Sequence, residues 1–116
     1  QPNVATTFWR LEMALSSIQK LERMQAFRPE NPIRIHYHQE GKEWAVGFFN
    51  PAHCERQWYI ENPFRVNTSK VCRAIGKTLD EAIDCLYKEF LMKISELKNS
   101  AELDIEKYQK YLSDVT

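Results

Sequence analysis

Two histidines, two positions apart, are the first residues in this sequence whose types and spacing suggest chemistry. His36 and His38 lie in an alternating apolar and polar stretch, so both imidazoles should project from one strand face, about 7 Å apart by strand rise. His53 and Cys54 would complete a zinc site with nitrogen and sulfur ligands. No second pair of ligands has a metal-site spacing. We therefore interpret the two histidines as a solvated strand face and expect no metal or other cofactor.

The cysteines suggest no thiol chemistry. Cys72 and Cys85 fall in apolar stretches, where cysteine usually packs as a small hydrophobic residue. Cys54 is adjacent to His53, but neighbours in sequence seldom face each other as nucleophile and base. Three cysteines without a C-x-x-C spacing favour reduced thiols and a cytoplasmic location. Phosphate-binding loops and nucleophile-elbow motifs are absent from the sequence. We expect no enzyme.

A basic run covers residues 56–77, where five basic residues stand against Glu61 alone. Aromatic residues at Trp58, Tyr59 and Phe64 interleave with it, a composition typical of nucleic-acid surfaces. An edge strand whose positive charges prevent pairing with another chain has the same composition, so both interpretations stay open. The candidate phosphate-binding residues are Arg56, Arg65, Lys70, Arg73 and Lys77.

The stretch from Cys72 to Leu97 predicts a short strand, a glycine turn at Gly76 and a long amphipathic helix. Thr78 and Glu81 have the spacing of a capping box, in which each side chain bonds the other residue's amide. Apolar residues then recur at spacings of three and four, which predicts a face packed on a sheet or another helix. They are Leu79, Ala82, Ile83, Leu86, Phe90, Ile94 and Leu97.

Periodicity and turn residues predict the remaining elements. Asn99 and Ser100 are expected to end or bend the long helix. In chain order we expect a helix over residues 6–26, strands over 31–38, 44–50, 56–61 and 70–75, and a last helix over 101–113. This order predicts one α+β domain over residues 1–116: an N-terminal helix, an antiparallel meander of four or three strands, a long C-terminal helix packed on the sheet and a short terminal helix.

Charge is balanced overall, with 16 basic and 16 acidic residues. A neutral chain lacks the general attraction to polyanions that nucleic-acid and membrane-surface binders show. The two signs are nevertheless separated. Residues 56–77 have a net charge of +4, and residues 78–116, with five basic and nine acidic residues, have −4. No apolar run is long enough to predict a membrane span.

The segments EWAVGFF and CRAIGKTLDEAIDCLYKEF resemble HicB-like antitoxin domains, small α+β proteins of phages and mobile elements. The shared features are a hairpin and a G-x-T-x-x-E-A turn, matched here by Gly76, Thr78, Glu81 and Ala82. The long leading helix and the extra segment 50–70 depart from that pattern, and no ribbon-helix-helix addition is recognisable.

The order of elements also looks like a double-stranded-RNA-binding domain, in which a basic cluster opens the second helix. In this chain Lys77 is followed by Asp80 and Glu81, which would repel phosphate.

These observations predict a non-enzymatic protein-binding module, an inhibitor or regulator of phage or mobile-element origin. Blocking of a host or cognate protein complex, as anti-CRISPR proteins do, is one concrete form. The alternative is a nucleic-acid-binding regulator, HicB-like or similar to a double-stranded-RNA-binding domain, that uses residues 56–77. A two-fold homodimer is expected if the terminal-helix stripe, Trp9 and Met13 are not buried within the chain. The candidate interaction residues are Trp58, Tyr59, Phe64, Ile105, Tyr108 and Leu112.

Overall fold

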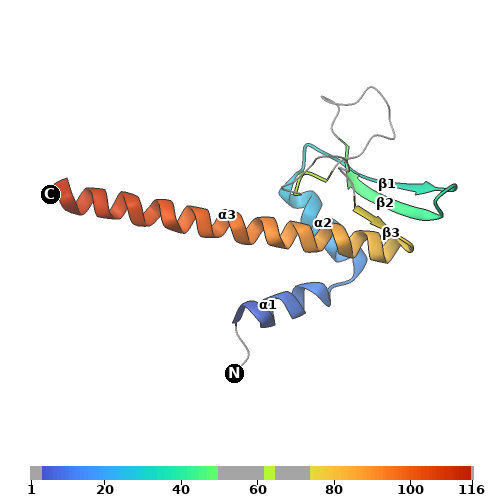
Figure 1. The fold of residues 1–116 in the computed structure, drawn as a ribbon, viewed down its shortest axis with the longest axis horizontal. Helices are drawn as coiled ribbons and strands as arrows, with labels where there is room; N and C mark the ends of the chain where they lie inside the picture. The colour runs from blue at the N-terminus through green and yellow to red at the C-terminus, as the bar shows by residue number, and fades with distance from the viewer. Residues whose placement is uncertain (1–3, 50–61, 65–73, 116) are drawn as a thin grey trace.

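The computed structural model describes residues 4–49, 62–64 and 74–115. Figure 1 shows a small α+β body from which one very long helix extends. Its elements are, in chain order, α1 (Val4–Met13), α2 (Ser17–Phe27), β1 (Ile33–His38), β2 (Glu43–Phe48), β3 (Ala74–Gly76) and α3 (Leu79–Val115). None of the helices in these described ranges is long and apolar enough to cross a membrane.

Residues 4–49 hold two helices where the sequence predicted one over residues 6–26. The chain breaks between them because Ser16 caps α2. The Ser16 hydroxyl accepts the backbone N–H of Gln19 at 3.2 Å, and the Gln19 side chain accepts the N–H of Ser16 at 3.0 Å. This reciprocal pair satisfies two helix-start donors and favours a new helix at this point. The single-helix prediction is therefore wrong.

The break also changes which residues face the core. Phe8, Leu11 and Ile18, which would share one face of a single helix over residues 6–26, are 45%, 67% and 68% exposed. Trp9 and Met13, named above as a possible dimer contact, pack against the core instead. A stripe that is continuous in sequence cannot stay on one face across a break that redirects the helix axis.

Three antiparallel strands in the order β1-β2-β3 form the sheet of the described residues. β1 pairs with β2 from Ile33↔Phe48 to His38↔Glu43, and β2 pairs with β3 through Val46↔Ala74. Apolar residues on both faces of β2 suit a central strand, and β2 lies between β1 and β3 with Ala45, Val46, Gly47 and Phe48 all buried. The predicted strand 56–61 and residues 70–73 of the last predicted strand lie outside the described residues.

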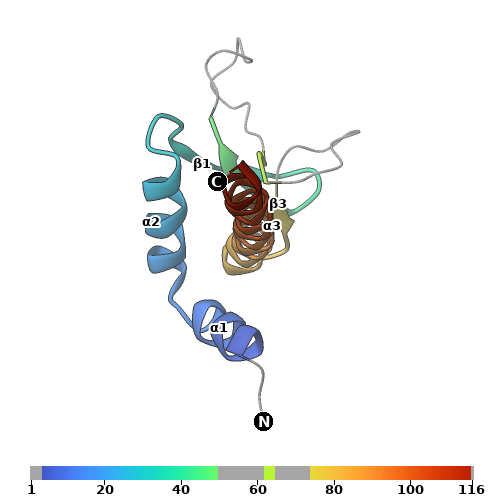
Figure 2. The ribbon, with the colours of Figure 1, turned by 90° about the vertical axis from the view of Figure 1, so that its left-hand side faces the viewer.

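α3 occupies the middle of the body, as the view along its axis shows (Figure 2). The sheet lies against one side of α3, and α1 and α2 lie against another. Side chains from α2, β2, β3 and α3 meet in one core, which partly buried residues of α1 and β1 border. The fully buried large side chains include Met24, Val46, Phe48, Ile83, Leu86 and Tyr87.

Two polar contacts fix α2 along α3. The Ser17 hydroxyl donates to Asp80 at 2.6 Å, and Lys20, 3% exposed, donates to Asp84 at 2.6 Å. Both pairs lie near the starts of their helices, so the starts of α2 and α3 lie side by side, and from there the two axes cross, as Figure 2 shows.

The start of α3 confirms the predicted capping box. The Thr78 hydroxyl accepts the Glu81 N–H at 3.1 Å, and the Glu81 carboxylate accepts the N–H groups of Lys77 and Thr78 at 3.0 and 3.4 Å. Gly76, predicted as the turn residue, does not have a positive φ. A Cβ at this position would instead lie 2.4 Å from the Ala82 backbone nitrogen, so glycine is required by close approach.

α3 continues without a break through Asn99 and Ser100 to Val115. The predicted end at these residues and the separate helix over 101–113 are therefore wrong. Asn and Ser each cost only a few tenths of a kcal/mol relative to alanine within a helix. Without a glycine or proline at this point, that cost does not stop a helix that has already formed.

Candidate protein-binding surface

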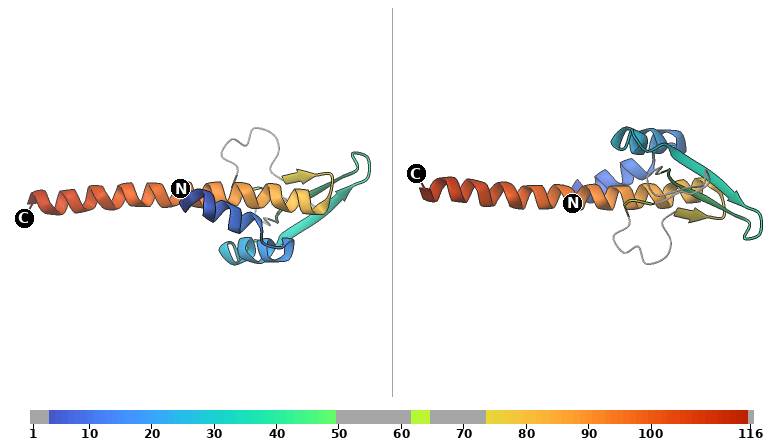
Figure 3. Two further views of the ribbon diagram at one scale, coloured as in Figure 1. Left: turned by 90° about the horizontal axis from the view of Figure 1, so that it is seen from below. Right: turned by 90° about the horizontal axis from the view of Figure 1, so that it is seen from above.

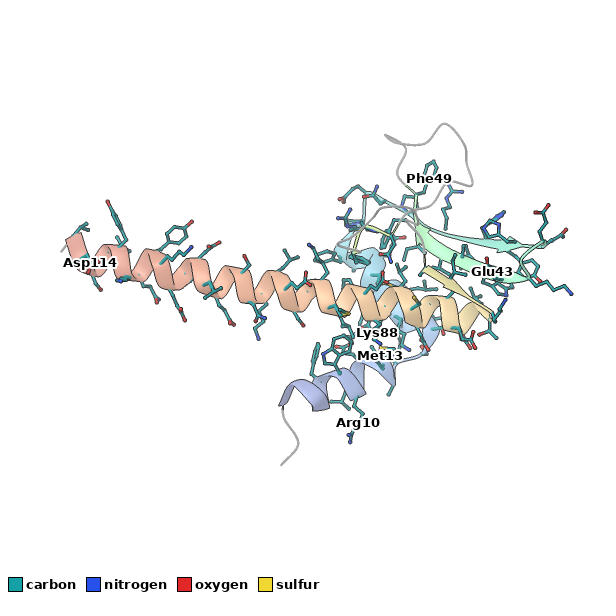
Figure 4. The ribbon with its side chains drawn as sticks, in the orientation of Figure 1. Arg10, Met13, Glu43, Phe49, Lys88 and Asp114 are labelled. Carbon is teal, nitrogen blue, oxygen red and sulfur yellow. The ribbon has the colours of Figure 1, made fainter. Side chains whose placement is uncertain are left out.

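The C-terminal half of α3 lies outside the body. We call residues 95–115 the protruding half; each of them is exposed. Both views in Figure 3 show it extending beyond the other drawn elements, and Figure 4 shows its side chains, out to Asp114, projecting into open space. At 1.5 Å rise per residue it is about 30 Å long.

The apolar stripe that packs in the body continues along the protruding half. Its residues recur at successive spacings of three, four and four, so each position repeats every eleven residues. Eleven residues make three helical turns, which keeps equivalent positions on nearly the same face. The three sets are Ile83, Leu86 and Phe90, then Ile94, Leu97 and Ala101, then Ile105, Tyr108 and Leu112.

Exposure along this stripe rises from the body to the tip. Leu86 is 0% exposed and Phe90 8%, whereas Leu97 is 46% and Tyr108 67% exposed. The helix therefore presents one continuous apolar face of which only the first part is covered. An apolar face of this length on a surface helix marks a site for protein contact.

A groove lies where the stripe leaves the body, between α1, α2 and α3. It encloses about 330 Å³. Carbon-rich side chains make most of its wall, and Phe90 and Ile94 belong both to the groove and to the stripe. Its lining residues are Phe8, Glu12, Arg23, Ala26, Tyr87, Phe90, Leu91 and Ile94.

The polar groups of this groove bond one another. The Tyr87 hydroxyl donates to the Glu12 carboxylate, and Arg23 Nη1 donates to both Glu12 oxygens at 2.7 and 3.0 Å. Burial, and then the hydrogen bond to Glu12, raises the pKa of Tyr87 to about 12. The Glu12 carboxylate accepts hydrogen bonds from both Arg23 and Tyr87, and the Tyr87 phenol stays protonated at neutral pH. This arrangement suits a structural role rather than proton transfer.

The predicted interaction residues fall into three groups. Ile105, Tyr108 and Leu112 come together on the exposed stripe, as the sequence suggested. Phe64 does not face solvent: it is 4% exposed, and its ring centroid lies 5.1 to 6.4 Å from those of Phe27, Phe48 and Phe90. Trp58 and Tyr59 lie outside the described residues.

Of the predicted phosphate-binding residues, only Lys77 is described. It is exposed, and its backbone N–H donates to Glu81. Asp80 and Glu81 therefore lie close to the single described member of the basic run. The other four, Arg56, Arg65, Lys70 and Arg73, lie outside the described residues, so nucleic-acid binding through this run stays a prediction.

The histidine pair is more compact than expected. The ring centroids of His36 and His38 are 4.5 Å apart in an edge-on arrangement, and both residues are half-buried rather than fully solvated. Among residues 4–49, 62–64 and 74–115, no group of three or more histidine, cysteine, aspartate or glutamate side chains is placed to hold a metal ion. His53 and Cys54 lie outside these ranges.

Comparison with known proteins gives no assignment: no protein family, no curated protein and no solved structure matches this chain. The resemblance to HicB-like domains therefore stays a prediction.

Proposed function

We propose that this chain is a non-enzymatic protein-binding module whose binding surface is the apolar stripe of the protruding half. The observation that supports this proposal is the continuity of the stripe. The face that packs in the body at Leu86 and Phe90 runs on, exposed, through Ile105 and Leu112. Amphipathic helices with anchors at spacings of three and four bind proteins by laying that face into a groove or along another helix.

The charge of the protruding half favours a protein partner. It carries five acidic residues against three basic ones, a net charge of −2. Helices that lie on anionic membranes or contact phosphates carry lysine and arginine on the polar face. The partner therefore presents an apolar surface without a strong anionic field. Inhibition of a host or cognate complex by occupying such a surface is the form of this function that the sequence analysis favours.

The experiment is affinity capture from nuclease-treated host lysate with three forms of the tagged chain. The double variant Ile105→Glu with Leu112→Glu places charge on the stripe. Leu103→Glu is the matched control, because Leu103 is 60% exposed but lies two residues from Ile105, on the opposite side of the helix. Far-UV circular dichroism verifies that all three forms stay helical.

We expect the native chain and the control to retain a stoichiometric protein partner and the double variant to lose it. In a parallel capture without nuclease, recovery of nucleic acid without such a protein would overturn the proposal. So would a partner that the double variant retains as well as the native chain does.

A further inference from the structure

We propose that two copies of this chain pair antiparallel through their protruding halves, each stripe covering the other. This inference rests on the proposed protein-binding function and names a second copy of the chain as the partner. A two-fold axis near residues 106 and 107 would relate the copies, so that the same surface is used by both.

The spacing of the stripe supports an antiparallel arrangement. From Ala101 to Leu112 the apolar spacings are four, three and four, and this series is the same in both directions. Antiparallel pairing about its midpoint therefore sets Ile105 opposite Tyr108 and Ala101 opposite Leu112, each pair occurring twice. Ala101 then faces the larger Leu112, and facing small and large residues is one way in which packed helix interfaces fill space.

The charges along the protruding half support the same orientation. Residues 101–106 carry three acidic side chains and no basic one, a net charge of −3, and residues 107–112 carry two lysines, a net charge of +2. Antiparallel pairing brings the acidic segment of each copy beside the basic segment of the other. Parallel pairing would set like charges beside each other, and exposed charges within about 10 Å still interact at moderate ionic strength.

The length of the protruding half also fits this arrangement. Complete overlap of two helices about 30 Å long would place the two bodies at opposite ends of the pair. The tip of each copy then ends beside Leu97 and Lys98, at the opening of the groove lined by Phe8 and Ile94. Only the stripe side of each protruding half would be buried, which makes a contact smaller than that of most stable interfaces, so we expect a dimer that dissociates on dilution in the micromolar range.

The test is sedimentation equilibrium of the native chain, Ile105→Glu and Leu103→Glu from low to high micromolar concentration. We expect the native chain and Leu103→Glu to reach the dimer mass and Ile105→Glu to stay a monomer. Added salt should weaken the dimer, since opposite charges are then screened. Small-angle scattering of the dimer should show two separated bodies.

A native chain that stays monomeric at high micromolar concentration would overturn the homodimer. The same holds if Leu103→Glu and Ile105→Glu dissociate it equally, and bodies found side by side would overturn the antiparallel arrangement. A monomer that still captures a different protein through Ile105 leaves the proposed function standing. A monomer without any stripe-dependent partner removes both proposals.

Discussion

The two halves of α3 carry the same apolar pattern in opposite surroundings. In the body half, residues 79–94, the stripe contacts the sheet, and Ile83 and Leu86 are at most 2% exposed. In the protruding half the equivalent positions, Ile105 and Tyr108, are 53% and 67% exposed. The difference shows that an apolar stripe predicts a contact but not whether the contact lies within the chain. We therefore expect the body half to determine folding and the protruding half to determine association.

The largest contrast should come from removing one leucine from each half of the stripe. Leu86→Ala leaves a cavity among fully buried neighbours, so we expect the free energy of unfolding to fall by about 2–5 kcal/mol. Leu112→Ala, at an exposed position of the same stripe, should change it by less than about 0.5 kcal/mol at low protein concentration. Urea denaturation measures both. Equal losses would contradict the division of α3 into two roles.

Gly76→Val should be the next most damaging change. Its Cβ would lie 2.4 and 2.8 Å from backbone atoms of Ala82 and Glu81, which cannot move without shifting the first turn of α3. We expect a loss of about 1–3 kcal/mol, typical of overpacking. Gly41→Val is the control, since the nearest atoms there are the flexible end of the Glu43 side chain. Thermal unfolding that ranks Gly41→Val as the worse variant would refute this account.

The buried phenol of Tyr87 should make stability depend on alkaline pH. Its pKa is raised from 10.0 to about 12 in the folded chain, so unfolding releases its proton more readily. The stabilisation is complete below pH 10 and is lost as the pH rises toward 12. Denaturation midpoints across this window should fall less steeply in Tyr87→Phe than in the native chain. Tyr108→Phe, which changes an exposed ring, should leave the slope as it is.

Removing either helix cap should cost about 1 kcal/mol, with a range of 0.5 to 2. Thr78→Ala removes the acceptor of the Glu81 N–H at the start of α3, and Ser16→Ala removes the equivalent acceptor at the start of α2. Similar losses in the free energy of unfolding, measured by chemical denaturation, would establish that a capping box stabilises both helix starts. No loss for Ser16→Ala would mean that packing alone separates α1 from α2.

Ser100→Pro should have the smallest effect on the body. Proline removes a helical hydrogen bond and displaces the preceding turn, and an isolated helix as short as residues 101–115 is marginal in water. We expect far-UV helicity to fall clearly while the free energy of unfolding of the body changes by less than about 0.5 kcal/mol. Ser100→Ala is the control and should preserve helicity. A global loss of stability would show that the protruding half contributes to folding.

Local patterns with one strong physical cause were predictable from the sequence. The capping box of Thr78 and Glu81, the burial of Leu86 and the central position of β2 all follow from spacing and alternation. The second capping box, at Ser16 and Gln19, has the same readable signature, but the apolar spacing running through it suggested one uninterrupted helix.

Other features depend on how distant elements meet. The groove joins Phe8 of α1 to Ile94 of α3, and Phe64 becomes buried because rings from α2, β2 and α3 surround it. No local pattern encodes those distances. The uninterrupted length of α3 was also missed, because Asn99 and Ser100 are frequent at helix ends yet only weakly unfavourable inside a helix.

The meeting of the starts of α2 and α3 has an electrostatic consequence. Peptide dipoles align along each helix, so each N-terminal end carries about half a positive charge, and here the two positive ends lie side by side. In an antiparallel pair they would lie at opposite ends. Asp80 belongs to the first turn of α3. Its carboxylate accepts a hydrogen bond from the hydroxyl of Ser17, the first residue of α2. One negative charge therefore compensates two helix macrodipoles and couples the start of α2 to the start of α3.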